Sequence, residues 1–155
     1  MILLLNPILA VALCVAPALA DFEFCWYVAH EQDASMAVVK FERLPVAIAI
    51  EHGSKTALLS PLQAEAIGKI LLKSDASFEL LKKSGRDGTE SFATDSHTIR
   101  FKYAADGERC SVSVIPRDQK NGSEFTLTRR QSTRFSSKLA NAGKLVEEAK
   151  RLVDG

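Results

Sequence analysis

The 155-residue chain has only three cysteines and three histidines, and it lacks the common short motifs of catalysis. It has no phosphate-binding loop, no glycine-rich dinucleotide fingerprint and no Gly-x-Ser-x-Gly nucleophile elbow. His30, His52 and His97 are not spaced like neighbouring metal ligands. These absences argue against nucleotide-dependent, serine-hydrolase and metal chemistry. We therefore predict no catalytic residue, no cofactor and no metal site.

The run Asp95-Ser96-His97 has the composition of a catalytic triad but not its expected geometry. Triad groups converge from separate elements, whereas neighbours on a strand point to opposite faces. Paired carboxylates, as in glycoside hydrolysis, are not expected either, because the acidic residues of the first strands are predicted to face solvent or lie in loops. An enzyme of an unrecognised class remains a second alternative. The acidic positions concerned are Glu23, Glu31, Asp33, Glu42 and Glu51.

The first twenty residues, MILLLNPILAVALCVAPALA, contain no charged side chain. They end in Ala18-Leu19-Ala20, the small-x-small pattern of a signal peptidase site. We therefore expect residues 1–20 to be a signal peptide, and residues 21–155 to be exported to the periplasm or secreted without a stable membrane anchor. The run has no preceding Lys or Arg, unlike most signal peptides. A retained single-span anchor is the alternative, because nineteen apolar residues could just span a bilayer.

Cysteine usage agrees with export, because only Cys25 and Cys110 remain after the predicted leader. An exported protein folds in a compartment that permits disulfides. We predict a Cys25–Cys110 bridge, which would close a loop of about 86 residues and contribute about 4–5 kcal/mol in the chain-entropy model. Two buried thiols are the alternative.

Two stretches of the chain repeat one pattern: LLSPLQAEAIGKILLKS at 58–74 and TLTRRQSTRFSSKLANA at 126–142. Each has the end of a strand, a Ser or Thr, two residues, a Gln and a long amphipathic run. Ser60 with Gln63 and Thr128 with Gln131 predict two capping boxes, from which helices would run to about 73 and 153. Alternating hydrophobicity predicts strands at 22–30, 36–44, 46–52, 55–60, 97–105, 108–116 and 123–128.

This order predicts a single α+β domain of two βββα units, at about 36–74 and 97–154, with an extra N-terminal strand and a connector at 75–96. The antiparallel sheets would be covered by two amphipathic helices. Asp106-Gly107 predicts a type I′ hairpin turn. A two-residue turn there would pair Tyr103 with Cys110, which would place Cys110 on the core face.

Charge is unevenly distributed, although the formal net charge is only +1. Residues 21–96 carry 8 Lys and Arg against 12 Asp and Glu, whereas residues 97–138 carry 9 against 4. The basic surplus is sharpest at the start of the second helix, where cations oppose the helix dipole. We call this set the basic ridge; it consists of Arg129, Arg130, Arg134 and Lys138.

Because ordinary helix stability does not require these cations, we predict that the basic ridge binds an acidic surface on a protein partner. The function predicted first is therefore that of a small exported binding protein of the inhibitor, immunity or accessory-subunit type. The first alternative is an anionic-ligand or polyanion binder that uses the same helix N-terminus, since free amides and arginines attract anions. Nucleic acid is not expected as a ligand of an exported protein. A solvated face without a partner is the alternative reading of the ridge.

Overall fold

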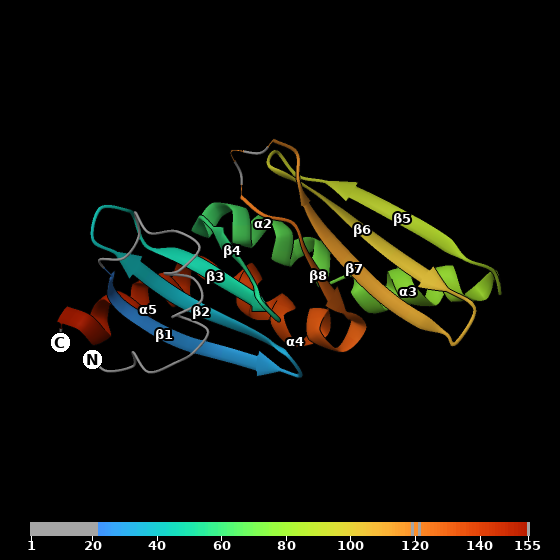
Figure 1. Cartoon of the computed structure of the whole chain (residues 1–155), viewed down its shortest axis with the longest axis horizontal. Helices are drawn as coiled ribbons and strands as arrows, with labels where there is room; N and C mark the ends of the chain where they lie inside the picture. Colours follow the sequence, from blue (N-terminus) through green and yellow to red (C-terminus); the bar gives the residue numbers. More distant parts are fainter. Residues whose placement is uncertain (1–21, 119, 121, 155) are drawn as a thin grey trace.

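The computed structural model describes residues 22–118, 120 and 122–154, so the predicted signal peptide lies outside the described residues. Two four-stranded antiparallel sheets run in the orders β1-β2-β3-β4 and β5-β6-β7-β8 (Figure 1). The first unit consists of β1 (Phe22–Glu31), β2 (Ala34–Phe41), β3 (Ala47–His52), β4 (Lys55–Leu59), α2 (Pro61–Leu71) and α3 (Ser74–Lys83). The second unit consists of β5 (Gly88–Ala93), β6 (His97–Ala104), β7 (Arg109–Pro116), β8 (Phe125–Thr128), α4 (Arg129–Ala140) and α5 (Ala142–Asp154).

The predicted α+β class and the two repeated units are confirmed, but each unit is larger than predicted. The stretch predicted as a connector holds both α3 and β5. Strand β5 pairs with β6 and contributes one large apolar side chain, Phe92, to the core. Each unit is therefore a four-stranded meander followed by two helices, and the extra strand predicted only for the first unit occurs in both.

The long second helix is interrupted at Asn141, which leaves helical geometry with φ −112° and ψ 28°. The Asn141 amide side chain donates to the carbonyl of Ser137 at 2.8 Å, and the Gly143 N–H donates to a carboxylate oxygen of Glu65 at 2.9 Å. Glu65 belongs to α2, so the first unit supplies the acceptor for an N–H at the start of α5. This tertiary bond stabilises the start of a new helix, α5, directly after the break.

Helices of each unit also pack on the sheet of the other unit. Helix α3 of the first unit packs on β5 and β6, whereas α4 packs on β1 as well as on β7 and β8, and α5 packs on β2. Helices α2 and α4 pack against each other between them, and a Cβ at Gly68 would lie 2.2 Å from the backbone nitrogen of Ala140. The result is one hydrophobic core shared by both sheets, with the sheets toward the viewer and the helices behind them in Figure 1.

Local sequence signals explain where the elements start and turn. Both predicted capping boxes are present: Ser60 accepts from the Gln63 amide, Thr128 accepts from the Gln131 amide, and each Gln side chain accepts from the cap amide. The predicted pairing of Tyr103 with Cys110 is confirmed. The turn type is not I′, because positive φ occurs at Gly107 and Glu108 rather than at both central residues.

The predicted disulfide is wrong, since Cys25 and Cys110 are both free thiols. Strand β1 does not join the second unit but pairs with β2, which keeps Cys25 in the first sheet. Cys25 belongs to a separate cluster on the face opposite the main core, whereas Cys110 packs against the main core from the second sheet. Opposite faces of different sheets cannot bring the two sulfurs within bonding distance. Among the described residues, no helix has the length and apolar character needed to cross a bilayer.

Candidate functional site: the outer face of the first sheet

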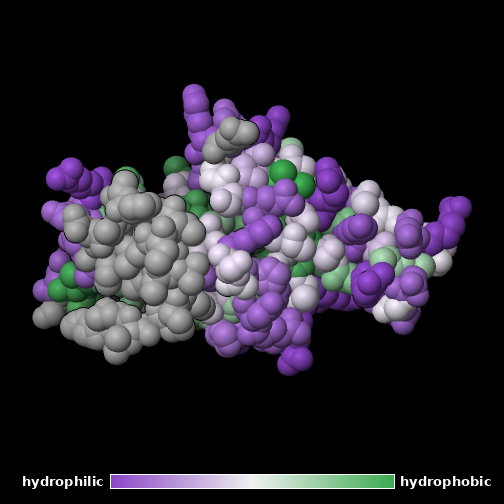
Figure 2. All heavy atoms as spheres, viewed as in Figure 1, coloured by the Kyte–Doolittle hydropathy of each residue, from purple (hydrophilic) through white to green (hydrophobic). Residues whose placement is uncertain are grey.

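Each sheet has an inner face, which packs on the helices, and an outer face that points away from them. The two outer faces differ in chemistry although the inner faces are alike. The register of the second sheet places hydroxyl-bearing and basic side chains outward, and Figure 2 shows mostly hydrophilic and neutral residues over β5–β8. The large apolar exception is Ile115, opposite Thr98. The hydroxyl-bearing and basic outward positions include Thr89, Ser91, Thr98, Arg100, Lys102, Ser111, Ser113 and Thr126.

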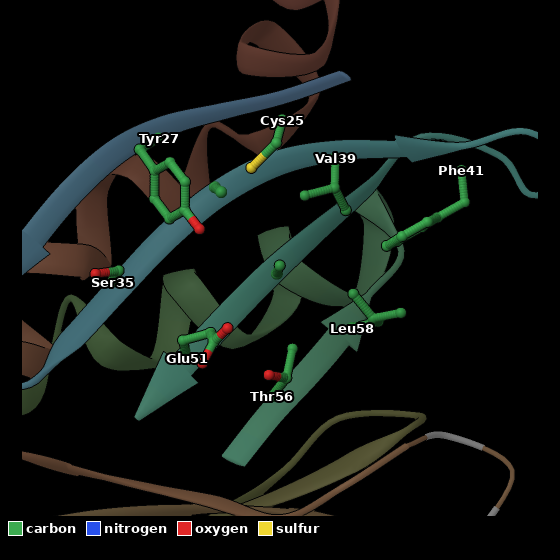
Figure 3. A pocket seen from close by; sticks show the side chains of 10 residues that line it. Cys25, Tyr27, Ser35, Val39, Phe41, Glu51, Thr56 and Leu58 are labelled. Carbon is green, nitrogen blue, oxygen red and sulfur yellow. The ribbon is translucent and has the colours of Figure 1, made fainter. Parts of the chain in front are cut away.

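The outer face of the first sheet is apolar instead, and its side chains form a second hydrophobic cluster. All members of the cluster come from strands or from the start of a strand, and helices α2, α4 and α5 lie on the other side of the sheet (Figure 1). In the full chain most of these side chains are buried, and Tyr27, Ala47 and Leu58 are partly buried. We call this surface the apolar sheet face; it consists of Cys25, Tyr27, Ser35, Ala37, Val39, Phe41, Ala49, Glu51, Thr56 and Leu58, which also line a pocket (Figure 3).

Glu51 is the only charged residue on the apolar sheet face. The prediction that it faces solvent is wrong, because only 3% of the residue is exposed. Within the described part of the chain, neither of its carboxylate oxygens has a hydrogen-bond partner. Burial raises the pKa of Glu51 to about 7, and the nearby Thr56 hydroxyl offsets part of this shift without forming a hydrogen bond of ordinary geometry.

The other titratable groups of this face are held in their neutral forms. Burial raises the pKa of the Cys25 thiol to about 11, so the thiolate that would act as a nucleophile is not formed near neutral pH. Burial also raises the pKa of Tyr27, and the neighbouring Cys25 adds to that shift. The face therefore offers one carboxylate amid apolar groups and hydroxyls, which suits binding better than nucleophilic catalysis.

The basic ridge is divided by the contacts that its members make. Arg129 donates to Asp75 at 2.8 Å and to Glu79 at 3.0 Å, and its guanidinium lies 5.6 Å from the ring centre of Phe78. The hydrogen bond to Asp75 is the main reason why the pKa of Arg129 is raised. Arg129 therefore joins α4 to α3 within the molecule. Sequence reasoning missed this because the acidic partners, Asp75 and Glu79, lie 54 and 50 positions away.

The remaining basic residues lie along the exposed side of α4. Arg130 forms an ion pair with Glu31 at 2.9 Å, although most of the Arg130 side chain is exposed. Among the described residues, Arg134 and Lys138 form no ion pair within 4.0 Å. An open depression is lined by Glu31, Asp75, Arg129, Arg130, Thr133 and Arg134. Three carboxylates of the first unit thus neutralise the start of the ridge and leave two unpaired cations further along α4.

The histidines are dispersed over the molecule. His52 pairs with Asp33 at 3.2 Å, and His30 is hydrogen-bonded to the Ser35 hydroxyl at 2.9 Å. Within residues 22–118, 120 and 122–154, no group of three or more His, Cys, Asp or Glu side chains could hold a metal ion.

Ser96 and His97 do contact each other, contrary to the expectation that neighbours point apart. The Ser96 hydroxyl lies 2.7 Å from Nδ1 of His97, because Ser96 lies in a bend before β6 rather than in the strand. Burial lowers the pKa of His97, and among the described residues its Nε2 has no hydrogen-bond partner. A triad needs a third group to orient the imidazole, so this pair lacks that geometry.

Comparison with known proteins adds no relative. The chain matches no protein-family model. A search of curated proteins finds no similar sequence.

Proposed function

We propose that the protein is a small exported binding protein that acts through a protein partner, in the manner of an inhibitor, an immunity factor or an accessory subunit. The apolar sheet face is its proposed binding surface. The observation that carries the proposal is the contrast between the two outer faces: one is rich in hydroxyls and cations, and the other is apolar.

Fold stability gives no reason for this contrast. Both sheets bury an inner face in the same shared core, and the second sheet is built with a polar outer face. An antiparallel sheet normally keeps one face for the core and one for water. If residues 1–20 are removed on export, as we expect, the remaining described helices all lie on the other side of the first sheet. Large apolar patches left open on a protein surface mark sites of association.

The basic ridge supports a smaller role in the same function. With Arg129 and Arg130 paired internally, Arg134 and Lys138 are the cations left to meet an acidic surface. One exposed and one half-buried cation favour electrostatic steering of a partner more than a tight anion site. The polyanion-binding alternative would need a longer unpaired cluster, and we rank it below protein binding.

Photocrosslinking in the cells that make the protein tests this proposal. A photoreactive phenylalanine analogue would replace Leu58 on the apolar sheet face, and a matched variant would carry it at Ser113 on the outer face of the second sheet. We expect a crosslinked adduct of one defined mass from the Leu58 position and not from the Ser113 position. Envelope fractionation and mass spectrometry would identify the partner and the N-terminus of the processed chain.

An adduct from Ser113 but not from Leu58 would place the partner on the wrong sheet and contradict the proposal. Absence of any adduct from both positions, with both variants folded and exported, would contradict it as well.

A further inference from the structure

Glu51 is the one feature of the apolar sheet face that hydrophobic association does not require. A buried carboxylate without hydrogen bonds is costly, and its removal in favour of a neutral residue of similar shape is expected to help folding. In the full chain both oxygens lack a partner among the described residues and only 3% of the residue is exposed, and a partner that covers the apolar sheet face of the processed chain would bury the carboxylate again. The carboxylate lies on the same face as Tyr27, Ser35 and Thr56 (Figure 3).

The basic side chains of the first sheet close to this face are engaged elsewhere. His30 is hydrogen-bonded at 2.9 Å to the hydroxyl of Ser35, the residue that pairs with Glu51 across the sheet. His52, the next residue in the chain, pairs with Asp33. Lys40 pairs with Glu23 at 2.8 Å and also donates to the carbonyl of Phe41 at 2.7 Å. Among the described residues, no Lys, Arg or His lines the pocket around Glu51. The Glu51 carboxyl group therefore has no ion-pair partner in the described part of this chain.

We infer that the protein partner places a lysine or arginine side chain against Glu51, with apolar residues on either side of that cation. This inference rests on the proposed function, because it assigns the chemistry of the partner at the same surface. The charge of Glu51 selects a cation, and the apolar residues Val39, Phe41 and Leu58 suit the methylene stem that a lysine or arginine carries behind its charged group. The hydroxyls of Tyr27, Ser35 and Thr56 provide further acceptors for the donors of an ammonium or guanidinium group.

A cation explains the site better than a purely apolar partner would. An apolar partner would leave the carboxylate desolvated and unpaired in the complex, which opposes binding. A cationic side chain turns the same group into a source of specificity, because partners without the charge would pay that cost. The partner's contact segment is thus expected to be basic at this point, whereas the surface facing Arg134 and Lys138 is expected to be acidic.

The test repeats the Leu58 crosslinking in three variants of the chain. We expect Glu51→Gln to lower the yield of the adduct by about tenfold or more, as for removal of one member of a desolvated charge pair, and Glu51→Lys to abolish it. Glu23→Gln, which removes an exposed carboxylate from the same sheet, should leave the yield unchanged. The thermal midpoint of the Glu51→Gln variant should equal or exceed that of the unaltered chain, so a loss of adduct would not be a loss of fold.

Sequencing of the crosslinked partner peptide supplies the second measurement, and it should contain a Lys or Arg close to the crosslinked residue. A normal adduct yield from Glu51→Gln, or a partner peptide without Lys or Arg, would overturn this inference while the binding surface itself stood. If Leu58 gave no adduct in the unaltered chain, the proposed function and this inference would fail together.

Discussion

The two sheets of this protein are built alike on the inside and differently on the outside. On the inner side, alternate residues such as Val38 in the first sheet and Val112 in the second are fully buried against the shared helices. On the outer side, the second sheet carries Arg100 and Lys102, and its Ser113 and Thr126 hydroxyls lie 3.1 Å apart. The corresponding side of the first sheet is apolar except for a buried carboxylate and its hydroxyl neighbours. The inner faces are therefore explained by the shared core. The difference between the two outer faces needs another explanation, which we seek in function.

The comparison assumes that both sheets share one core, and Gly68→Ala should break that core most severely. A Cβ at this position would lie 2.2 Å from the Ala140 nitrogen and 2.6 Å from the Leu139 carbonyl carbon, both backbone atoms that cannot rotate away. We expect a loss of about 3 kcal/mol or more in the free energy of unfolding. Urea unfolding followed by circular dichroism and by the fluorescence of Trp26 should show one transition, shifted equally for both probes.

Gly143→Ala is the matched control for this substitution. Its Cβ would meet a side-chain oxygen of Glu65 at 2.7 Å, and that flexible group can move aside at the cost of about one hydrogen bond. Separate transitions for the two probes, or an unmoved midpoint in Gly68→Ala, would show that the sheets do not depend on one core.

Glu51 should make the stability of the full-length chain depend on pH in the direction opposite to an ordinary ion-paired carboxylate. Its pKa is raised from an ordinary 4.5 to about 7, so the folded chain holds this proton more tightly than the unfolded chain does. Stability is then greatest at low pH and falls as pH rises from about 4.5 to 7, by up to about 3 kcal/mol. Glu51→Gln should remove this dependence, so that the variant gains on the unaltered chain between pH 5 and pH 8.

Urea midpoints at several pH values measure this gain, and Glu23→Gln serves as the control because Glu23 is exposed and paired with Lys40. Parallel pH profiles for Glu51→Gln and the unaltered chain would mean that Glu51 is ionised at little cost. The environment of Glu51 on the first sheet would then be closer to that of a solvent-exposed carboxylate than the apolar composition of the face suggests.

Much of the fold could be predicted from local signals, because those signals act over a few residues. The capping boxes at Ser60 and Thr128 and the pairing of Tyr103 with Cys110 follow from turn and cap chemistry alone. Strand β5 could not be found in this way, since its one large apolar residue, Phe92, gives little periodicity. The break at Asn141 depends on Glu65 in another unit, which no local pattern reveals.

The site was harder to predict because its properties arise from tertiary contacts. Arg129 looked available from its position at a helix start, but Asp75 and Glu79 approach it from α3. Glu51 looked exposed because a single acidic residue in a strand usually marks the solvent side. The predicted Cys25–Cys110 bridge failed for a related reason: alternation assigned each cysteine to a face, but not to the sheet in which its strand would pair.

Removal of each N-cap hydroxyl tests whether the two units use their capping boxes in the same way. Ser60→Ala and Thr128→Ala should each lower the free energy of unfolding by about 0.5–2 kcal/mol. Thr128 should cost more, because its hydroxyl also donates to the side chain of Gln32 at 2.9 Å. Ser137→Ala, on the exposed side of α4, is the control and should change little. Midpoints for Ser60→Ala and Thr128→Ala that equal that of Ser137→Ala would contradict the stabilising role of the two capping boxes.

The smallest expected effect concerns the unpaired end of the basic ridge. Arg134→Glu with Lys138→Glu should change the free energy of unfolding by less than about 0.5 kcal/mol, because surface charges without an ion-pair partner contribute little to stability. The double variant should slow association with the crosslinked partner by about threefold at low salt and hardly at all at high salt, since rim charges steer encounter rather than hold the complex. Arg130 is left unchanged because a carboxylate there would face Glu31.

The control is Arg100→Glu with Lys102→Glu on the outer face of the second sheet, which makes the same change in net charge. If both pairs slow association equally, the ridge acts only through the net charge of the protein. If the ridge pair alone slows association, the partner's acidic surface lies beside α4.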